Sequence, residues 1–135
     1  MPEMPLTARD IMSKSVVTAS PSMSVKELAK LLADNRISGV PVTDHTGALL
    51  GIVSEADILS RKLGHNTVRS IMTTDVIAVG DSESVQEISL LLSMKRINRV
   101  PVVCNGQVVG IVSRTDIVRA MAGITAAPSA RENPS

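Results

Sequence analysis

The chain has 135 residues, 44% hydrophobic and 20% charged, and these proportions exclude an intrinsically disordered protein. Lysine and arginine (14) nearly balance aspartate and glutamate (13), so no global charge attracts nucleic acid or an anionic membrane. The absence of Phe, Tyr and Trp removes the rings on which single-stranded bases stack. No apolar run approaches the ~18 residues that a membrane span needs. We therefore expect a cytoplasmic protein with neither nucleic acid nor membrane as partner.

The sequence contains an internal repeat. Residues 11–42 match residues 71–102 at fourteen of thirty-two positions when the chain is shifted by sixty. After a one-residue deletion in a turn the similarity resumes, and residues 51–58 match residues 110–117. Repeats of this kind pack together, because neither copy can bury its apolar surface alone. We expect four segments: a first repeat at 8–60, a connector at 61–67, a second repeat at 68–121 and a disordered tail at 122–135.

Each repeat predicts the same elements in the same order: a strand, a helix, a hairpin of two strands and a second helix. In the first repeat they are expected at 16–18, from 24, at 40–43, at 49–53 and at 54–63. In the second they are expected at 76–79, from 84, at 100–103, at 108–112 and at 113–121. The predicted fold class is α/β, with two β-α-β-β-α repeats packed about a pseudo-twofold axis.

Local sequence signals support several of these boundaries. Ser24 and Glu27 have the spacing of a capping box, which begins a helix, and Ser84 and Glu87 repeat it. The dipeptide at 105–106 is Asn-Gly, a strong signal for a tight hairpin turn. Pro41 and Pro101 lack a backbone N–H, so each is expected at a strand start or at a sheet edge.

The pattern Ser-x-x-Asp follows the hairpin in both repeats, as Ser54/Asp57 and Ser113/Asp116. One interpretation is structural, because a serine followed three residues later by an acid caps a helix. The other is functional, because a carboxylate can accept both ribose hydroxyls while serine and Thr115 donate to a phosphate near the helix N-terminus. Gly51 and Gly110 precede the pattern, and each glycine indicates close approach of a ligand or of backbone. The residues alone leave both interpretations open.

The segments Asp10-Ile-Met-Ser13, Arg36-x-x-x-Val40-Pro-Val42 and Gly51-Ile-Val-Ser54-x-x-Asp57 resemble a CBS domain. The second repeat has the same pattern as Ser70-Ile-Met-Thr73, Arg96-x-x-x-Val100-Pro-Val102 and Gly110-Ile-Val-Ser113-x-x-Asp116. Two such domains in tandem form a CBS pair, also called a Bateman module, and the resemblance covers residues 8 to 121. It implies a cleft between the repeats that binds adenine nucleotides or, less often, S-adenosylmethionine or related adenosyl ligands.

The resemblance also implies crossed pockets, in which the Ser-x-x-Asp of one repeat faces the segment before the proline of the other. One predicted pocket combines Ser113, Arg114, Thr115 and Asp116 with Ser15, Ser38 and Gly39. The other combines Ser54 and Asp57 with Asp75, Asn98 and Arg99. Without aromatic rings, adenine would lie between aliphatic walls, which we expect from Ile37, Val40, Ile97 and Val100. We favour the Asp116 pocket, because Glu55 and Asp75 would repel the phosphates in the other.

These observations predict a regulatory module that binds AMP, ADP or ATP and modulates a separate, unidentified protein. The alternatives are a sensor of S-adenosylmethionine or another adenosyl ligand, and a ligand-free dimerisation scaffold. His45, His65 and Cys104 are isolated in the sequence, so we expect no enzyme activity, no metal and no cofactor beyond the regulatory nucleotide. We also expect a homodimer, with its apolar contacts drawn from Leu28, Leu59, Ile88 and Val118.

Overall fold

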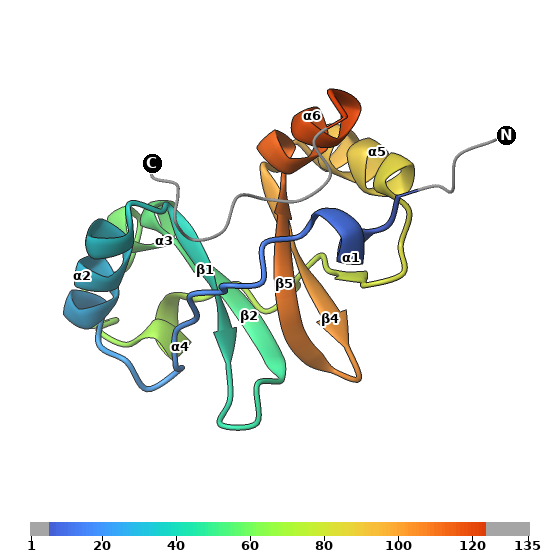
Figure 1. Ribbon diagram of the computed structural model, residues 1–135. Helices are drawn as coiled ribbons and strands as arrows, with labels where there is room; N and C mark the ends of the chain where they lie inside the picture. The colour runs from blue at the N-terminus through green and yellow to red at the C-terminus, as the bar shows by residue number, and fades with distance from the viewer. Residues whose placement is uncertain (1–5, 124–135) are drawn as a thin grey trace, which may run out of the picture. The chain divides into compact units, whose positions relative to one another are not determined.

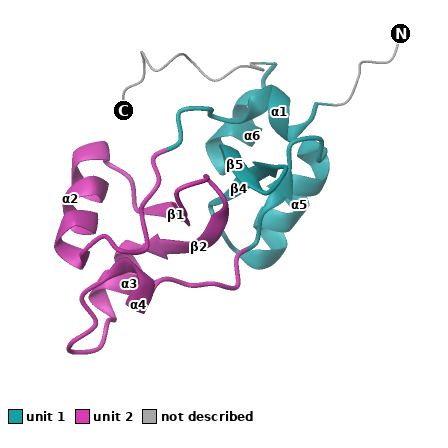
Figure 2. Cartoon of the chain, turned by 90° about the horizontal axis from the view of Figure 1, so that it is seen from below, with its two compact units in different colours: residues 1–16, 77–135 teal, residues 17–76 magenta. Residues whose placement is uncertain are grey.

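The computed structural model describes residues 6–123, which form two compact units (Figures 1 and 2). Unit 2 is one continuous stretch, residues 17–76. Unit 1 is built from the two flanking stretches, 1–16 and 77–135, of which 6–16 and 77–123 are described. The predicted tail at 122–135 therefore lies, from residue 124 onward, outside the described residues.

Unit 2 contains helix α2 (Val25–Asn35), strands β1 (Gly39–Thr43) and β2 (Leu49–Ser54), and the short helices α3 (Glu55–Leu59) and α4 (Val68–Ile71). Helix α2 begins as predicted: Glu27 N donates to Ser24 Oγ at 3.0 Å, and Ser24 N donates to Glu27 Oε1 at 2.9 Å. Strands β1 and β2 form an antiparallel pair. The core of this unit consists of Ala19, Leu28, Leu32, Val40, Val42, Val53 and Val68.

Unit 1 contains helix α1 (Ala8–Ile11), strand β3 (Val79–Gly80), helix α5 (Val85–Lys95), strands β4 (Arg99–Cys104) and β5 (Gln107–Ser113), and helix α6 (Arg114–Met121). The sheet order is β3-β4-β5, with β3 parallel and β5 antiparallel to β4. Asn105 and Gly106 join β4 to β5 with positive φ angles of 54° and 80°, which confirms the predicted tight turn. The core consists of Ala8, Ile11, Val79, Ile88, Leu92, Val100, Val102, Val112 and Ile117.

The first strand of each repeat is shorter than predicted. Residues 16–18 form no strand, and only the next residue, Ala19, bridges to Val42. In the second repeat the strand contains only Val79 and Gly80. Helix α3 also ends early, at Leu59 rather than near residue 63. Two side chains satisfy its last carbonyls: Ser60 Oγ donates to Ala56 O at 2.8 Å, and an Arg61 guanidinium N–H donates to Ile58 O at 2.7 Å.

The two prolines lie inside strands rather than at their ends. Pro41 is the third residue of β1 and pairs in register with Ile52. Its carbonyl points away from β2 and accepts the N–H of Ala19 at 3.0 Å, and Thr43 N donates back to Ala19 O at 3.0 Å. On the side of β1 that faces Ala19, the backbone hydrogen bonds begin at the carbonyl of Pro41. No carbonyl on that side therefore needs the N–H that proline lacks. The expected edge position is confirmed for Pro41, because β1 is an edge strand of a two-stranded sheet, and is wrong for Pro101, because β4 lies between β3 and β5.

The segment that begins each repeat packs into the unit formed by the rest of the other repeat. Helix α1 and Ser13 belong to unit 1, where Ser13 and Ile111 exchange backbone hydrogen bonds of 2.9 and 3.0 Å. Helix α4 and Thr73 belong to unit 2, where Thr73 and Ile52 exchange bonds of 2.8 and 2.9 Å. Neither short helix was predicted, although each begins at a threonine cap, Thr7 or Thr67. The compact units therefore differ from the linear repeats at 8–60 and 68–121.

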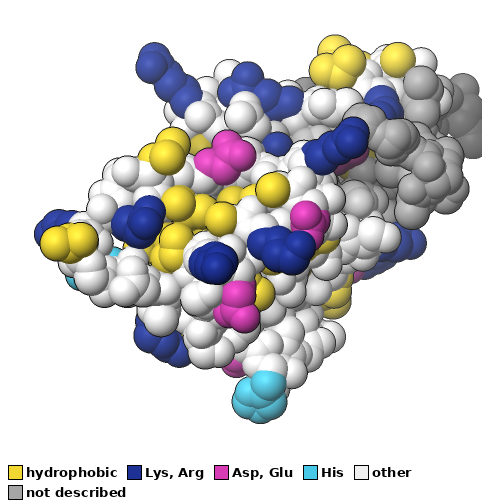
Figure 3. Space-filling model, turned by 90° about the vertical axis from the view of Figure 1, so that its left-hand side faces the viewer, with side chains coloured by type: hydrophobic (Ala, Val, Ile, Leu, Met, Phe, Trp, Pro, Cys, Tyr) yellow, Lys and Arg dark blue, Asp and Glu magenta, His cyan; other side chains and the backbone are white. Residues whose placement is uncertain are grey.

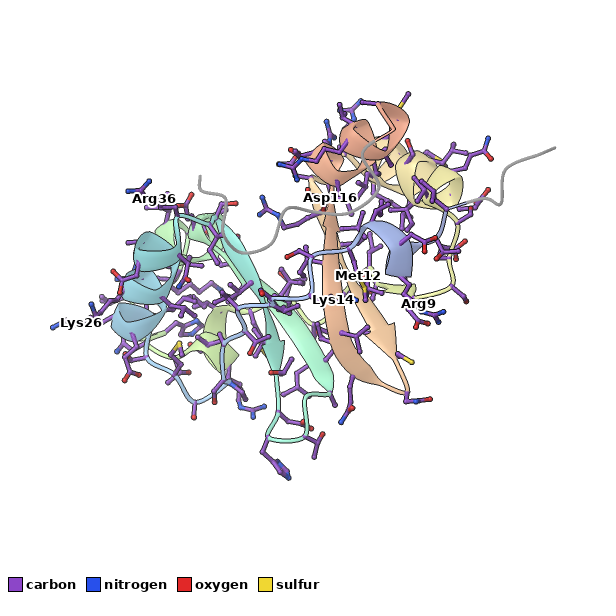
Figure 4. The ribbon with its side chains drawn as sticks, in the orientation of Figure 1. Arg9, Met12, Lys14, Lys26, Arg36 and Asp116 are labelled. Atoms are coloured by element: carbon purple, nitrogen blue, oxygen red, sulfur yellow. The ribbon has the colours of Figure 1, made fainter. Side chains whose placement is uncertain are left out.

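The two glycines before the Ser-x-x-Asp pattern make room for these exchanged segments. A β-carbon on Gly51 would lie 2.6 Å from the carbonyl oxygen of Thr73. A β-carbon on Gly110 would lie 2.7 Å from Cγ of Met12, the side chain that lies over β5 in Figure 4. Close approach of backbone, one of the two predicted explanations, accounts for Gly51, whereas Gly110 makes room for the side chain of Met12, which was not predicted.

The ion pair between Arg9 and Asp81 makes an acid-dependent contribution to the stability of unit 1. Arg9 Nη2 donates to Asp81 Oδ2 at 2.7 Å and holds the pKa of that carboxyl below its ordinary value of 3.8. A carboxyl with a lowered pKa stabilises the folded state at neutral pH and loses this effect as the pH falls below about 4. We expect Asp81→Asn to lose less of its unfolding free energy than the wild type between pH 6 and pH 3, measured by urea denaturation. An equal loss in both proteins would contradict this role.

Within residues 6–123, no helix is long and apolar enough to cross a membrane.

Candidate functional site

The N-terminus of α6 has the geometry of a complete capping box. Ser113 N donates to Asp116 Oδ2 at 2.8 Å, and Ser113 Oγ donates to the same oxygen at 3.0 Å. Asp116 N is 3.3 Å from Ser113 Oγ, which closes the ring. The structural interpretation of Ser-x-x-Asp is therefore confirmed for this helix, because both residues are used as a cap.

The cap uses only one oxygen of the Asp116 carboxylate. A carboxylate has about four acceptor positions, two on each oxygen. The two hydrogen bonds from Ser113 both go to Oδ2, while Oδ1 lies 3.7 Å from Arg119 Nη1, beyond ordinary hydrogen-bond distance. Asp116 is only 8% exposed, and Figure 4 shows it at the start of α6. The cap therefore uses Oδ2, whereas Oδ1 faces the Arg119 guanidinium.

The segment before β4 lies directly beside this helix start. Arg114 N donates to Asn98 O at 2.9 Å, and Arg114 Nε donates to Ile97 O at 3.1 Å. Arg99, the first residue of β4, is paired in register with Ser113. The structure thus brings seven of the predicted site residues together within unit 1: Ile97, Asn98, Arg99, Ser113, Arg114, Thr115 and Asp116.

Unit 2 repeats the arrangement with different side chains. Ser54 N donates to Asp57 Oδ2 at 2.8 Å, and Ser54 Oγ donates to it at 3.1 Å. Glu55 N donates to Ser38 O at 2.8 Å, and Gly39 is paired in register with Ser54. Glu55 takes the place of Arg114, so this helix start carries an acid where the other carries a base. Asp57 is half-buried, whereas Asp116 is buried.

The remaining predicted residues have mixed outcomes. Ser15 and Asp75 are exposed and lie two residues beyond the bridges at Ser13 and Thr73. Ile37 and Ile97 are half-buried and pack against the cores of their own units. The expectation that Val40 and Val100 form aliphatic walls was wrong, because they are 2% and 0% exposed within those cores. The predicted pairing of residues from different repeats stays a prediction.

Two features of the structure were not predicted. Arg119 pairs with Asp116 across one helical turn, a contact that the i, i+3 spacing could have indicated. Arg36 and Arg96 end α2 and α5 in the left-handed conformation, with φ of 55° and 56°, at a position where glycine is usual.

The structure gives no support for a metal centre in residues 6–123. No group of three or more His, Cys, Asp or Glu side chains is placed there to hold a metal ion. His45 and His65 are both exposed, in the β1–β2 turn and in the segment after α3, and Cys104 is half-buried at the end of β4.

Comparison with known proteins places this geometry in a family. The chain is 38% identical over 123 residues to an L-aspartate semialdehyde sulfurtransferase of Methanocaldococcus jannaschii, covering 88% of this chain but only 24% of that enzyme. The match to that enzyme thus involves only a quarter of its length, and the enzyme's activity is not implied for this chain.

Two similar solved structures contain adenosyl ligands. The CBS domain pair of protein MJ0100, in complex with 5′-methylthioadenosine and S-adenosyl-L-methionine, is 35% identical, with a TM-score of 0.79 over 89% of this chain and 98% of that one. CBSX2, from Arabidopsis thaliana, in complex with AMP is 30% identical, with a TM-score of 0.82 over 87% of this chain and 97% of that one.

The family model for the CBS domain matches twice, at residues 8–64 and 68–123. These matches account for the two repeats, and the similar structures confirm the predicted α/β class of the CBS pair. This chain therefore belongs to the CBS domain family and contains two of its domains in tandem.

Proposed function

We propose that this protein is a non-enzymatic regulatory module of the cytoplasm that binds an adenine nucleotide and modulates a separate protein. The observation that carries the proposal is the Asp116 carboxylate, which is buried at the start of α6 and uses only Oδ2 in the helix cap, while Oδ1 faces Arg119. Ribose hydroxyls need acceptors of this kind, and the neighbouring Ser113 and Thr115 can donate to a phosphate. The AMP and S-adenosylmethionine found in similar structures support an adenosyl ligand.

The charge beside each helix start favours the Asp116 end for a phosphorylated ligand. The backbone N–H of Arg114 donates to Asn98 O, and its side-chain Nε donates to Ile97 O, so one hydrogen bond already holds the guanidinium beside the helix start. A positioned guanidinium suits phosphate recognition, because less side-chain freedom is lost on binding. Glu55 occupies the corresponding place beside Asp57, where it would repel a phosphate.

The ligand is tested by the melting temperature of the full chain, because a ligand that binds only the folded state stabilises it. We expect AMP or ATP, at concentrations near 100 times the dissociation constant, to stabilise the fold by about 2.7 kcal/mol. GTP should raise the melting temperature less, since the pocket would read an adenine edge. The measurement needs calorimetry or an extrinsic dye, because the chain has no Trp or Tyr.

Three other outcomes would change the proposal. A larger shift with S-adenosylmethionine than with AMP would favour the alternative adenosyl-ligand sensor. No shift with any adenosyl compound would favour a ligand-free scaffold, in which Ser-x-x-Asp is only a helix cap. Equal shifts with AMP, GTP, CMP and UMP would contradict adenine recognition.

The proposal includes association of two copies of the chain. Two of the four residues expected in the contact cannot take part, because Leu28 and Ile88 are fully buried in the cores. The other two, Leu59 and Val118, are 86% and 63% exposed. The surface that joins the copies must therefore be sought among exposed side chains.

A further inference from the structure

The ion pair between Asp116 and Arg119 brings a positive charge to the candidate site. Asp116 uses Oδ2 in the helix cap, and its other oxygen, Oδ1, lies 3.7 Å from Arg119 Nη1. The side chain of Asp116 is 9% exposed, whereas that of Arg119 is 37% exposed. The group beside Oδ1 is therefore a guanidinium that solvent, and hence a ligand, can reach.

This guanidinium competes with a ribose for Oδ1. A hydroxyl that donates to Oδ1 needs a position about 2.7–2.8 Å from that oxygen. Because the carboxylate is buried, a ligand has to approach it beside the Arg119 guanidinium and displace that group. Displacement costs little, since 3.7 Å is too long for a hydrogen bond and partly exposed ion pairs are weak. Arg119 can therefore move when a ligand binds.

Unit 2 shows that the helix cap does not need this arginine. Ser60 occupies the corresponding place in the repeat, three residues after Asp57. Its hydroxyl donates to Ala56 O at 2.8 Å rather than to the carboxylate. Asp57 nevertheless accepts the same two cap hydrogen bonds from Ser54, at 2.8 and 3.1 Å. The arginine of unit 1 is thus not required by the cap, and its contact with the carboxylate can serve the ligand.

Arg119 also adds to the positive charge around the proposed phosphate position. The Cα–Cβ bonds of a helix tilt toward its N-terminus, so the Arg119 side chain reaches back toward the start of α6, where Arg114 lies. In unit 2, Glu55 takes the place of Arg114 and Ser60 takes the place of Arg119. The site in unit 1 therefore has two arginines where unit 2 has an acid and a serine.

We propose that Arg119 is a specificity-determining residue of the Asp116 site and selects an adenosyl ligand that carries phosphate. Any adenosyl ligand has to displace the guanidinium from Oδ1 in order to place its ribose there. A phosphate gives the displaced guanidinium a new partner, whereas adenosine offers none and the sulfonium of S-adenosylmethionine repels it. This inference rests on the proposed function and names the charge class of the ligand at that same site.

The decisive variant is Arg119→Ser, which gives α6 the residue that unit 2 carries. Calorimetric titration of the full chain compares AMP, adenosine and S-adenosylmethionine, and we expect the wild type to bind AMP most tightly. In the variant, the dissociation constant for AMP should rise about 10-fold or more, the range for a lost charge-assisted hydrogen bond. The constant for adenosine should instead fall about 2- to 5-fold, because no ion pair is left to displace.

Two control variants separate ligand selection from net charge and from folding. Arg119→Lys keeps a positive charge and should keep the preference for AMP over adenosine. Lys26→Ser removes one positive charge from α2 (Figure 4), on the side of the molecule where Figure 3 shows other Lys and Arg side chains, and should leave both constants unchanged. Tighter binding of adenosine by Arg119→Ser would also show that this variant remains folded.

The outcomes distinguish this inference from the proposed function. A wild type that binds none of the three compounds would overturn both. A wild type that prefers AMP, with an unchanged preference in Arg119→Ser, would overturn the role of Arg119 and leave the proposed function in place. Equal weakening of AMP and adenosine in Arg119→Ser would overturn it too. Tighter binding of adenosine or S-adenosylmethionine than of AMP by the wild type would overturn the selection of phosphate.

Discussion

Replacing Asp116 by asparagine should weaken AMP binding by about 1.5–3 kcal/mol, the range for a hydrogen bond to a charged group. The asparagine carbonyl can still accept the two hydrogen bonds that Ser113 donates to Oδ2, so the helix cap is kept. The side-chain amide, however, replaces Oδ1, the oxygen proposed to accept from the ribose, and an amide nitrogen only donates. Calorimetric titration of both proteins with AMP measures the difference.

The ligand provides the matched control for this variant. The wild type should bind 2′-deoxy-AMP more weakly than AMP, whereas Asp116→Asn should discriminate much less between them. The same pair of measurements on Asp57→Asn reports whether the unit 2 helix start also binds. If both variants keep the wild-type preference for ribose and its affinity, the Ser-x-x-Asp pattern is only a cap, and the proposed function loses its central residue.

Substituting Gly51 by alanine should destabilise the protein by about 1–3 kcal/mol, the cost of forcing an extra carbon into a packed site. The new methyl group would lie 2.6 Å from the carbonyl oxygen of Thr73. That oxygen accepts the Ile52 N–H at 2.9 Å, so it cannot withdraw without loosening the bridge that holds the exchanged segment. Urea denaturation of the full chain measures the change.

Gly110→Ala is the corresponding change in unit 1, but its obstacle is a side chain. The added carbon would meet Met12, whose Cγ would lie 2.7 Å away. Met12→Ala should therefore remove most of the cost of Gly110→Ala in a double-mutant cycle. Met72→Ala should not rescue Gly51→Ala, because the obstacle there is a backbone oxygen. Equal rescue in both units would contradict this difference.

The helices and hairpins could be predicted because their signals are local. Ser24 with Glu27 and Ser113 with Asp116 form capping boxes within four residues, and Asn105-Gly106 makes its turn within two. Short strands and exchanged segments depend on partners far away in the sequence, such as Ile111 for Ser13. The periodicity of apolar residues does not indicate such long-range pairs. This is why residues 16–18 were overestimated as a strand and α1 and α4 were missed.

The candidate site was predictable in residue type but not in atomic detail. The pattern identified Ser113 and Asp116, yet it could not show that the cap uses one carboxylate oxygen and that the other faces Arg119. It also placed Val40 and Val100 at the ligand, whereas each lies in a run of three consecutive buried strand residues and packs into the core of its unit. The side chains on both faces of these strand segments are buried, and the sequence alone does not show which strand residues stay accessible.

The nesting of one unit within the other has a consequence for the order of folding during synthesis. Unit 2 is continuous, so it can fold as soon as residue 76 has left the ribosome. Unit 1 must wait, because Ile11 and Ser13 find their partners only when β5, at residues 107–113, has been made. Contacts between residues so far apart in the sequence form slowly during folding. The apolar residues of the early segment therefore stay without their partners until residues 107–113 have been made.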